Sequence, residues 1–425
     1  METQDTKIME LLEACYGEEL SLLQGNLAAL EDRITVLIRQ WGQGLLQRAV
    51  SKHPLGYQGA GRVCSCGGWQ RFVSYRVKAI HTTVGWIEIR RAYYHCSACG
   101  TGVYPYDQAS GLGSEAVSAG LAKACCTLAI GSSFAESSRR IEELFGQPVA
   151  SKTIERIVHH VGSVAADEHR QNLEVFRQDR HVPACDRPPK RLYIAPDGTT
   201  VHERDGWHES KIGCLRWEDQ RQVPRQYYVG GFEDCEIFGR YLWWEACRHG
   251  LREAAEIVYL GDGALWIRGL HEKHFRRATF IVDWYHAQKH IWDCAKILWG
   301  EGHQETARWA RRCCGWLWEG WTRKVLTDLV RRRKDYRGRK RKAVEDLHRY
   351  IKVNEEQMRY DLFRAQGYAV GSGMVEGACH HVVGDRLKGS GMIWSRAGSS
   401  ATLALRICWL NHEWDQLWQQ KPLVA

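Results

Sequence analysis

Two short stretches decide the fold: residues 191–199 read RLYIAPDGT, and residues 256–264 read EIVYLGDGA. Each begins with apolar and β-branched residues typical of a strand. Each then reaches an Asp-Gly pair, and the glycine lets the backbone turn tightly and a substrate approach closely. The sequence therefore predicts two strands that end at the aspartates Asp197 and Asp262.

The elements around these stretches follow an ordered pattern. We expect strands at residues 210–216, 225–230 and 279–282, the last of which ends at Asp283. We expect helices at residues 236–249 and, a short one, at 266–273. Three strands, helix, strand, helix, strand is the order of the RNase H fold, in which the first and fourth strands are neighbours. Asp197 and Asp262 are therefore expected side by side, although 65 residues separate them.

Two aspartates at adjacent strand ends form an oxygen-rich site suited to Mg²⁺, or to Mn²⁺. A two-metal site needs a further carboxylate, and we assign Glu376, in the stretch GSGMVEGACH at residues 371–380. These small residues are expected to open a helix that packs on the sheet. In such a site one ion activates a water or a DNA 3′-hydroxyl, and the other stabilises the leaving oxygen.

Each acid also has a purely structural interpretation. Asp-Gly is a common turn dipeptide, and a glutamate at a helix start commonly serves the helix dipole. What favours Asp197, Asp262 and Glu376 together is their placement on one fold order. Asp283 is the rival second acid, but its strand is expected at the sheet edge, farther from Asp197.

Two cysteine pairs, Cys64 with Cys66 and Cys96 with Cys99, lie beside glycine turns and are joined by segments that read as strands, at residues 71–78 and 86–94. This is the pattern of a zinc ribbon, in which two turns present four thiolates to one Zn²⁺. The alternative is four free buried cysteines without metal. The spacing of one residue between Cys64 and Cys66 is shorter than usual. His95 is an alternative ligand, although its place at the end of a strand favours ordinary packing.

Residues 114–165 read as three helices, at about 114–129, at 133–145 with Gly146 as the stop, and from Ser151 as N-cap. A helix, a tight turn and a capped basic helix resemble the outline of a helix-turn-helix. In that arrangement Lys152, Thr153 and Arg156 face DNA. The alternative is a three-helix packing that does not bind DNA.

Two further segments are expected to be helical. Residues from about Lys7 to Val50 read as a packing or dimerisation arm. About ninety residues precede Glu376, and among them nine of the twelve residues at 331–342 are basic: Arg331, Arg332, Arg333, Lys334, Arg337, Arg339, Lys340, Arg341 and Lys342. Such a run is usually a solvated face, but it also suits backbone phosphates. The neighbouring tryptophans are core residues or base-stacking platforms.

Composition narrows the class of protein. The chain has 425 residues, a net charge of +9 and 19 tryptophans, which points weakly towards nucleic acid. No apolar run is long enough to span a bilayer, and the first residues do not resemble a secretory signal. We therefore expect a cytoplasmic protein, with its 16 cysteines reduced, most easily in a bacterium near the nucleoid.

The sequence resembles a known family. The stretches YIAPDGTTVHERDGWHESKIGCLR, YLGDGALWIRGL, FIVDWYHAQKHIWDCAK and GSGMVEGACHHVVGDRLKGSGMIWS are similar to the core of insertion-sequence DDE transposases of the ISKra family. The block YYHCSACGTGVYPYD is similar to that family's zinc-ribbon region, so the likeness runs from about Val63 to Trp414. It implies that Asp197, Asp262 and Glu376 are the catalytic acids. Asp283 and His286 match a D-x-x-H signature of Mutator-like relatives.

These observations predict a DNA transposase that binds the inverted repeats of its element, cuts the ends and joins them to target double-stranded DNA. We expect an α/β RNase H-like core at residues 191–298 and 366–425, interrupted by a basic helical insertion at 299–365. Before it we expect a helical arm (1–55), a zinc ribbon (56–110), a helix-turn-helix (111–177) and a linker (178–190).

The expected cofactors are catalytic Mg²⁺ and structural Zn²⁺, and the expected assembly is a homo-oligomer, since two DNA ends must be held together. Two alternatives remain at this stage. One is a stand-alone nuclease of the same fold, and the other is a DNA-binding regulator without catalytic activity.

Overall fold

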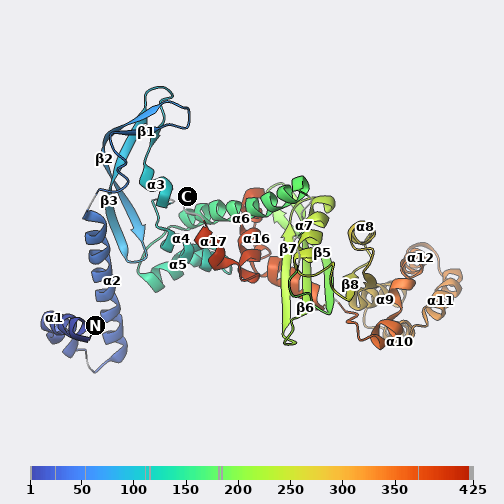
Figure 1. Cartoon of the computed structure of the whole chain (residues 1–425). Coiled ribbons are helices and arrows are strands. Elements are labelled where there is room, and N and C mark those ends of the chain that lie inside the picture. Colours follow the sequence, from blue (N-terminus) through green and yellow to red (C-terminus); the bar gives the residue numbers. More distant parts are fainter. Residues whose placement is uncertain are drawn as a thin grey trace. The chain divides into compact units, whose positions relative to one another are not determined.

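The computed structural model (Figure 1) describes residues 2–23, 25–52, 54–110, 112–113, 116–179, 182, 185–371 and 373–420. The chain forms two compact units, Met1–Val161 with Trp418–Ala425, and Gly162–Leu417. The division falls inside one long helix, ahead of the expected linker at residues 178–190. No helix in the described part of the chain is long and apolar enough to cross a membrane.

The first unit opens with two helices, α1 (Glu2–Ser21) and α2 (Leu27–Ser51). The helical structure expected from about Lys7 to Val50 is therefore confirmed, but it is divided into two helices. The helix breaks because Asn26 adopts an extended backbone and caps α2, accepting a hydrogen bond from the Ala29 N–H at 3.2 Å.

A four-stranded antiparallel sheet follows in the order β1-β2-β3-β4. Its strands are β1 (Gly61–Val63), β2 (Trp69–Thr82), β3 (Gly85–Cys96) and β4 (Gly102–Val103), and α3 (Pro105–Ser110) comes next. The central hairpin extends beyond the expected segments at 71–78 and 86–94, because the β2–β3 pairing continues from Gln70 and Cys96 to Thr82 and Gly85.

Three helices follow: α4 (Ala119–Ala129), α5 (Phe134–Phe145) and α6 (Ser151–Asp179), inside which the first unit ends. The first does not start at Ser114, which lies outside the described residues. It starts after Ser118, because Val117 forms a bridge with His81 that keeps the chain extended. The expected stop of α5 at Gly146 is confirmed by its left-handed backbone, φ +63°. Ser151 is the first residue of α6.

The second unit contains a mixed five-stranded sheet in the order β7-β6-β5-β8-β9. Its strands are β5 (Arg191–Glu203), β6 (Gly206–Glu218), β7 (Pro224–Gly231), β8 (Glu256–Gly261) and β9 (Thr279–Val282). Strands β5, β6 and β7 pair antiparallel, whereas β8 and β9 run parallel to β5. The predicted adjacency of the first and fourth strands is confirmed, and so is the edge position of the last strand.

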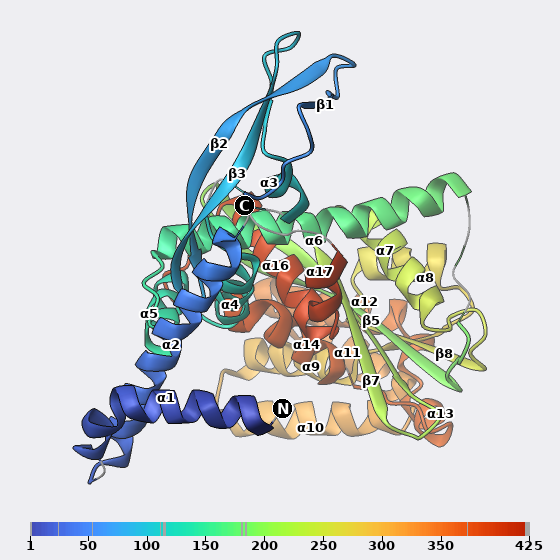
Figure 2. The same cartoon turned by 60° about the vertical axis from the view of Figure 1, so that its left-hand side comes forward.

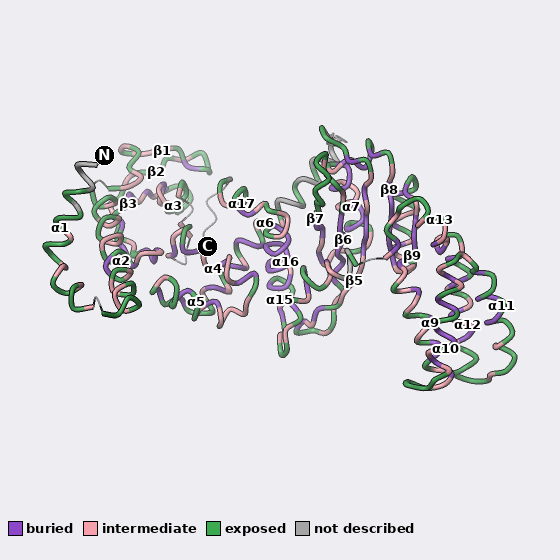
Figure 3. The backbone as a smooth tube through the Cα atoms, turned by 90° about the horizontal axis from the view of Figure 1, so that it is seen from below, coloured by how far each residue is buried: buried purple, intermediate pink, exposed green. Residues whose placement is uncertain are grey.

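Helices α7 (Cys235–Arg248) and α8 (Leu265–His274) lie beside this sheet (Figure 2). Their apolar residues Phe238, Leu242 and Leu270 share one core with Ile194 of β5 and Tyr259 of β8. Burial of this apolar area is the main force that fixes the strands, and with them the residues at their ends. Figure 3 shows buried residues gathered along the sheet and along α16 (Arg396–Leu410).

The segment expected to be a helical insertion is helical. It contains α10 (Gln304–Trp318), α11 (Thr322–Asp335), α12 (Gly338–Val353), the short η1 (Glu356–Met358) and α13 (Tyr360–Ala365). Together with α9 (Trp284–Trp299), helices α10–α12 cluster at one end of the sheet (Figure 1). The chain then returns to the sheet through α14 (Gly373–Ala378), a π-helical turn (Cys379–Gly384) and α15 (Asp385–Leu387), and after α16 it ends in α17 (Trp414–Gln420).

Candidate functional site

Asp197 and Asp262 lie at the same level of neighbouring strands. The parallel pairing of β5 with β8 runs from Arg191 and Glu256 to Ile194 and Tyr259. Each aspartate is three residues beyond the last of these pairs. The adjacency therefore follows from register, as the strand order predicted.

Asp197 does not end its strand, and in this respect the prediction was wrong. It lies inside β5, opposite Ile212 of β6, because the two strands form a long hairpin that continues to Glu203 and Gly206. The Asp-Gly pair at 197–198 is accordingly not a turn. The structural interpretation as a turn residue applies only to Asp262, whose Oδ1 accepts the Ala264 N–H at 2.7 Å.

The carboxylate of Asp197 is held by two donors. Its Oδ1 accepts the N–H of Gly198 at 2.7 Å, and its Oδ2 accepts the thiol of Cys379 at 3.3 Å. Burial raises the pKa of Asp197, and the negative charge of Asp262 raises it further, against the effect of these hydrogen bonds. The ionised form of Asp197 is therefore disfavoured, and a cation bound beside the carboxylate would stabilise it.

Asp283 and His286 form a second pair at the same end of the sheet. Asp283 is fully buried and caps α9, its Oδ1 accepting the backbone N–H of His286 at 2.8 Å. The same oxygen lies 2.9 Å from Nδ1 of His286. The hydrogen bond with Asp283 raises the pKa of His286, and the charges of Asp262 and Asp197 add to the effect. Asp283 thus orients a histidine that is close to both other acids.

Glu376 falls in α14, and its side chain lies outside the described residues. The helix contacts β5 and β6. Cys379, three residues after Glu376, places its thiol against Asp197. The segment that carries the third predicted acid therefore reaches the first one.

Two residues of this site were not predicted. Cys379 belongs to the stretch that contains Glu376, so its proximity to Asp197 was available from that motif. Tyr350 of α12 donates its hydroxyl hydrogen to the backbone oxygen of Asp262 at 2.9 Å. No local pattern marks Tyr350, because its contact depends on how a distant helix packs.

Four thiols gather in the first unit, with ligand atoms within 4.8 Å of one another: Cys64, Cys66, Cys96 and Cys99. Sγ of Cys64 lies 3.7 Å from that of Cys99, and Sγ of Cys66 lies 3.8 Å from that of Cys96. The Thr101 hydroxyl and backbone lower the pKa of Cys99 to about 6, which favours a thiolate. Four sulfurs in one group fit a structural Zn²⁺, and His95 is not a member among the described residues.

Residues 68–416 match one protein family, and this region covers the second sheet, the first sheet except β1, and every predicted acid. The chain belongs to the uncharacterised protein family UPF0236. No curated protein matches the sequence. The UPF0236 match begins after Cys64 and Cys66, so it includes only the second cysteine pair.

The helix-turn-helix candidates Lys152, Thr153 and Arg156 share the first turns of α6 within the UPF0236 region. Lys152 and Arg156 are exposed and Thr153 is half-buried. Lys152 pairs with Glu155 at 2.8 Å, and an Arg156 Nη2 donates to the Thr153 hydroxyl at 3.3 Å. These three side chains therefore form one polar surface.

The basic run of this UPF0236 chain spans the end of α11 and the start of α12, and its members do not have equal roles. Asp328, which is buried, accepts hydrogen bonds from Trp309 Nε1 at 2.7 Å, Arg332 Nε at 2.6 Å and Arg331 Nη2 at 3.0 Å. Asp328 therefore joins α11 to α10 through Trp309, which is a core residue, and Arg332 is held by the same carboxylate. The exposed members are Arg331, Arg333, Lys334, Arg337, Arg339, Lys340, Arg341 and Lys342.

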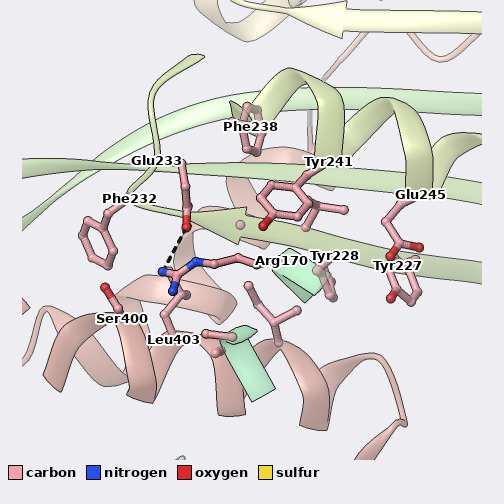
Figure 4. Close-up of a pocket in the computed structure, with 16 residues that line it drawn as sticks. Arg170, Tyr227, Tyr228, Phe232, Glu233, Phe238, Tyr241, Glu245, Ser400 and Leu403 are labelled. Atoms are coloured by element: carbon pink, nitrogen blue, oxygen red, sulfur yellow. Dashed lines mark ion pairs between the residues drawn. The ribbon is translucent and has the colours of Figure 1, made fainter. Parts of the chain in front are cut away.

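A pocket elsewhere in the second unit is separate from these residues (Figure 4). It is lined by aromatic residues of β7 and α7, by α16 and by Arg170 of α6, which lies 3.8 Å from Glu233. Glu245 in its wall is buried, and burial raises its pKa to about 7. None of the predicted acids lines it, so we do not assign it to the same chemistry.

Proposed function

We propose that this UPF0236 protein is a DNA transposase with an RNase H-like core, in which Asp197, Asp262 and Glu376 are the catalytic acids. The observation that carries the proposal is the register of β5 and β8, which aligns Asp197 with Asp262. The resemblance to ISKra-family transposases assigns the same residues. The sheet order β7-β6-β5-β8-β9 is the one that an RNase H-like fold requires.

The residues present suit a divalent cation with oxygen ligands, Mg²⁺ or Mn²⁺. Asp197 is a buried carboxyl with a raised pKa beside a second carboxyl, and a bound cation would stabilise its ionised form. When bound, such ions polarise a phosphodiester and lower the pKa of a water or hydroxyl. Asp197, Asp262 and Glu376 would hold them.

The chain's own groups have distinct parts in this mechanism. Gly198 and Cys379 fix the carboxylate of Asp197, Tyr350 fixes the loop of Asp262, and Asp283 orients His286. In cleavage, water adds to the phosphorus and leaves a 3′-hydroxyl and a 5′-phosphate. In strand transfer, that 3′-oxygen bonds to the phosphorus of a target phosphodiester and the bond from this phosphorus to the target's own 3′-oxygen breaks. The attacking hydroxyl gives its proton to solvent, and the released 3′-oxygen takes one from solvent.

DNA recognition is assigned to other surfaces. Lys152, Thr153 and Arg156 on α6 form a compact polar face, as expected for a helix-turn-helix. The exposed arginines and lysines of the basic run would neutralise backbone phosphates, which is independent of sequence. The four thiols would hold a structural Zn²⁺ in a zinc ribbon, and the protein would act as an oligomer in a bacterial cytoplasm.

The test is cleavage and joining on a DNA fragment that carries the gene's own flanking sequence. Purified protein with Mg²⁺ is compared with Glu376→Gln. Nicking at defined ends followed by joining to a plasmid, both lost in the variant, is the expected result. Cleavage without end specificity would instead indicate a nuclease, and specific binding without cleavage a regulator.

A further inference from the structure

Helix α2 carries a stripe of exposed apolar side chains. Leu27, Ile34, Ile38 and Leu45 are exposed by 76%, 39%, 58% and 68%. They are separated by seven, four and seven residues, which places them within about 40° of one another around a helix with 3.6 residues per turn. The stripe is about 27 Å long at 1.5 Å per residue.

The other faces of α2 are occupied inside the first unit. One face holds α1, through Trp41 Nε1 to the Tyr16 hydroxyl at 3.3 Å and through the ion pair of Arg33 with Glu19. Another holds β3, where Gln43 and Gln47 donate to the backbone oxygens of Trp86 and Glu88. Leu46 and Val50 pack against the apolar residues of β2 and β3. The α1 face adjoins the stripe at Trp41, whereas Leu27, Ile34, Ile38 and Leu45 stay exposed.

The spacing of the stripe is that of a coiled-coil seam. Leu27, Ile34, Ile38 and Leu45 follow steps of seven, four and seven residues, and the charged Glu31 and Arg48 continue the same spacing of three and four. Trp41, at the seam position between Ile38 and Leu45, packs on Tyr16 of α1. The four exposed apolar residues are therefore the seam positions open to a second helix. Gly44 lies next to the seam on an exposed part of the helix, and an added side-chain carbon there would meet nothing within 4 Å.

The two ends of the seam carry opposite charge. Glu31 lies near its amino end, whereas Arg48 and Lys52 lie near its carboxyl end, and all three are exposed. A second copy in the antiparallel direction would place each Glu31 against the other copy's Arg48, and each Ile34 against the other copy's Leu45. A parallel pair would place like charges together, which is unfavourable.

We propose that α2 pairs with α2 of a second copy of this chain as an antiparallel two-stranded coiled coil. The contact is isologous, so the same stripe serves both copies and closes the assembly at two chains. The inference goes beyond the proposed function, because it rests only on α2. If that function holds, the contact would supply the two chains that hold two DNA ends.

The first test is the mass of the full-length protein in solution, by size-exclusion chromatography with light scattering and without DNA. We expect twice the chain mass of 48.9 kDa. Ile38→Glu should halve the measured mass. The matched control is Val36→Glu. Val36 is 40% exposed and lies on the opposite side of α2 from Ile38, so this variant should leave the mass unchanged.

A wild-type protein that is monomeric at tens of micromolar, or an Ile38→Glu variant that stays dimeric with unchanged helicity, would overturn the proposal. Because no DNA or activity is involved, a failed cleavage assay does not affect this test, and a failed mass test does not affect the proposed chemistry.

The second test addresses direction. In the antiparallel register the two copies of position 38 lie near the two-fold axis, whereas the two copies of position 27 are far apart. Ile38→Cys should therefore crosslink to itself with a short bismaleimide, and Leu27→Cys should not, relative to wild type with its exposed Cys15. Equal crosslinking at both positions would contradict the antiparallel pair.

Discussion

The four-thiol cluster of the first unit and the cluster of predicted acids in the second unit both carry side chains that metals prefer, and they differ in completeness. The four thiols of the first unit lie within 4.8 Å of one another and leave no ligand to be supplied from elsewhere. The carboxylates of the second unit are drawn from strands and a helix that are distant in sequence, and their donors are oxygens. Closed thiol sites are structural, whereas open oxygen sites leave room for a substrate.

The two clusters should therefore control different properties, the fold for the thiols and the chemistry for the acids. The thiols lie between short strands and turns, so a metal there would stabilise the fold of the small sheet. The acids sit on a sheet whose core is apolar and complete without them. Removing a thiol should therefore unfold a region, and removing an acid should abolish chemistry while leaving the fold intact.

The largest effect is expected at the thiols. Cys96→Ser should reduce bound zinc from about one ion per chain to nearly none and make the four-stranded sheet sensitive to protease, because a structural site needs all four ligands. Zinc content by mass spectrometry and limited proteolysis measure this. The control is Cys15→Ser, an exposed cysteine outside the cluster. Full zinc content in Cys96→Ser would show that the cluster is not the site.

The next effect is expected on activity. Asp262→Asn should lower DNA cleavage by about 10³-fold, as the loss of about 4 kcal/mol of transition-state stabilisation would. Its melting temperature should change by only a few degrees. Glu209→Gln, at an exposed carboxylate of β6, is the control. If Asp262→Asn lost activity only because it unfolded, the acids would control the fold as the thiols do, which would contradict this prediction.

Glu245 is a buried acid outside both clusters, and its effect on stability should depend on pH. Burial raises the pKa of Glu245 to about 7 from 4.5, so the folded protein should lose up to about 3 kcal/mol of stability as pH rises from 4.5 to 7. Glu245→Gln should remove this loss. Urea unfolding at pH 5 and pH 8 measures it, and a stability difference between variant and wild type that is independent of pH would contradict it.

Replacing Asp197 should change stability and activity in opposite directions. Stability should rise by a small amount, whereas activity should be lost. Because the pKa of Asp197 is raised, its charge at neutral pH destabilises the fold, and Asp197→Asn should raise the melting temperature by a few degrees without divalent ions. Mg²⁺ should then stabilise the wild type and not the variant. Glu245→Gln should keep its full response to Mg²⁺, which serves as the control.

The smallest effect concerns His286. Asp283→Asn keeps a capping oxygen for α9 but removes the charge that raises the histidine's pKa. The His286 pKa should fall, as followed by NMR titration. The control is His81 of β2, whose pKa is lowered by burial and should not change in this variant. An unchanged His286 would mean that Asp283 does not set its protonation.

The sequence predicted the strand order and the adjacency of two acids because both depend on local patterns. Apolar runs ending in Asp-Gly mark β5 and β8, and the order of elements then fixes which strands are neighbours. The four-thiol group followed from spacing alone, even with a single residue between Cys64 and Cys66. Local turns at Gly67 and Gly100, both with positive φ, allow that geometry.

What the sequence could not predict depends on contacts between distant segments. The strand through Asp197 continues because β6 pairs with it, and no residue near Asp197 signals this. Arg332 reads as part of a charged run, yet a buried Asp328 engages it. The break before α2 was visible as Gly25-Asn26, but apolar periodicity on both sides concealed it.

The role of Asp262 in a Mg²⁺-dependent site is tested most directly by single-turnover cleavage of the flanking DNA. Cleavage is measured as a function of Mg²⁺ concentration for wild type and Asp262→Asn. We expect saturable, Mg²⁺-dependent cleavage at the element ends by the wild type, and none above background by the variant at any Mg²⁺ concentration. Equal cleavage by the two proteins would contradict the assignment of Asp262, and with it the site that β5 and β8 align.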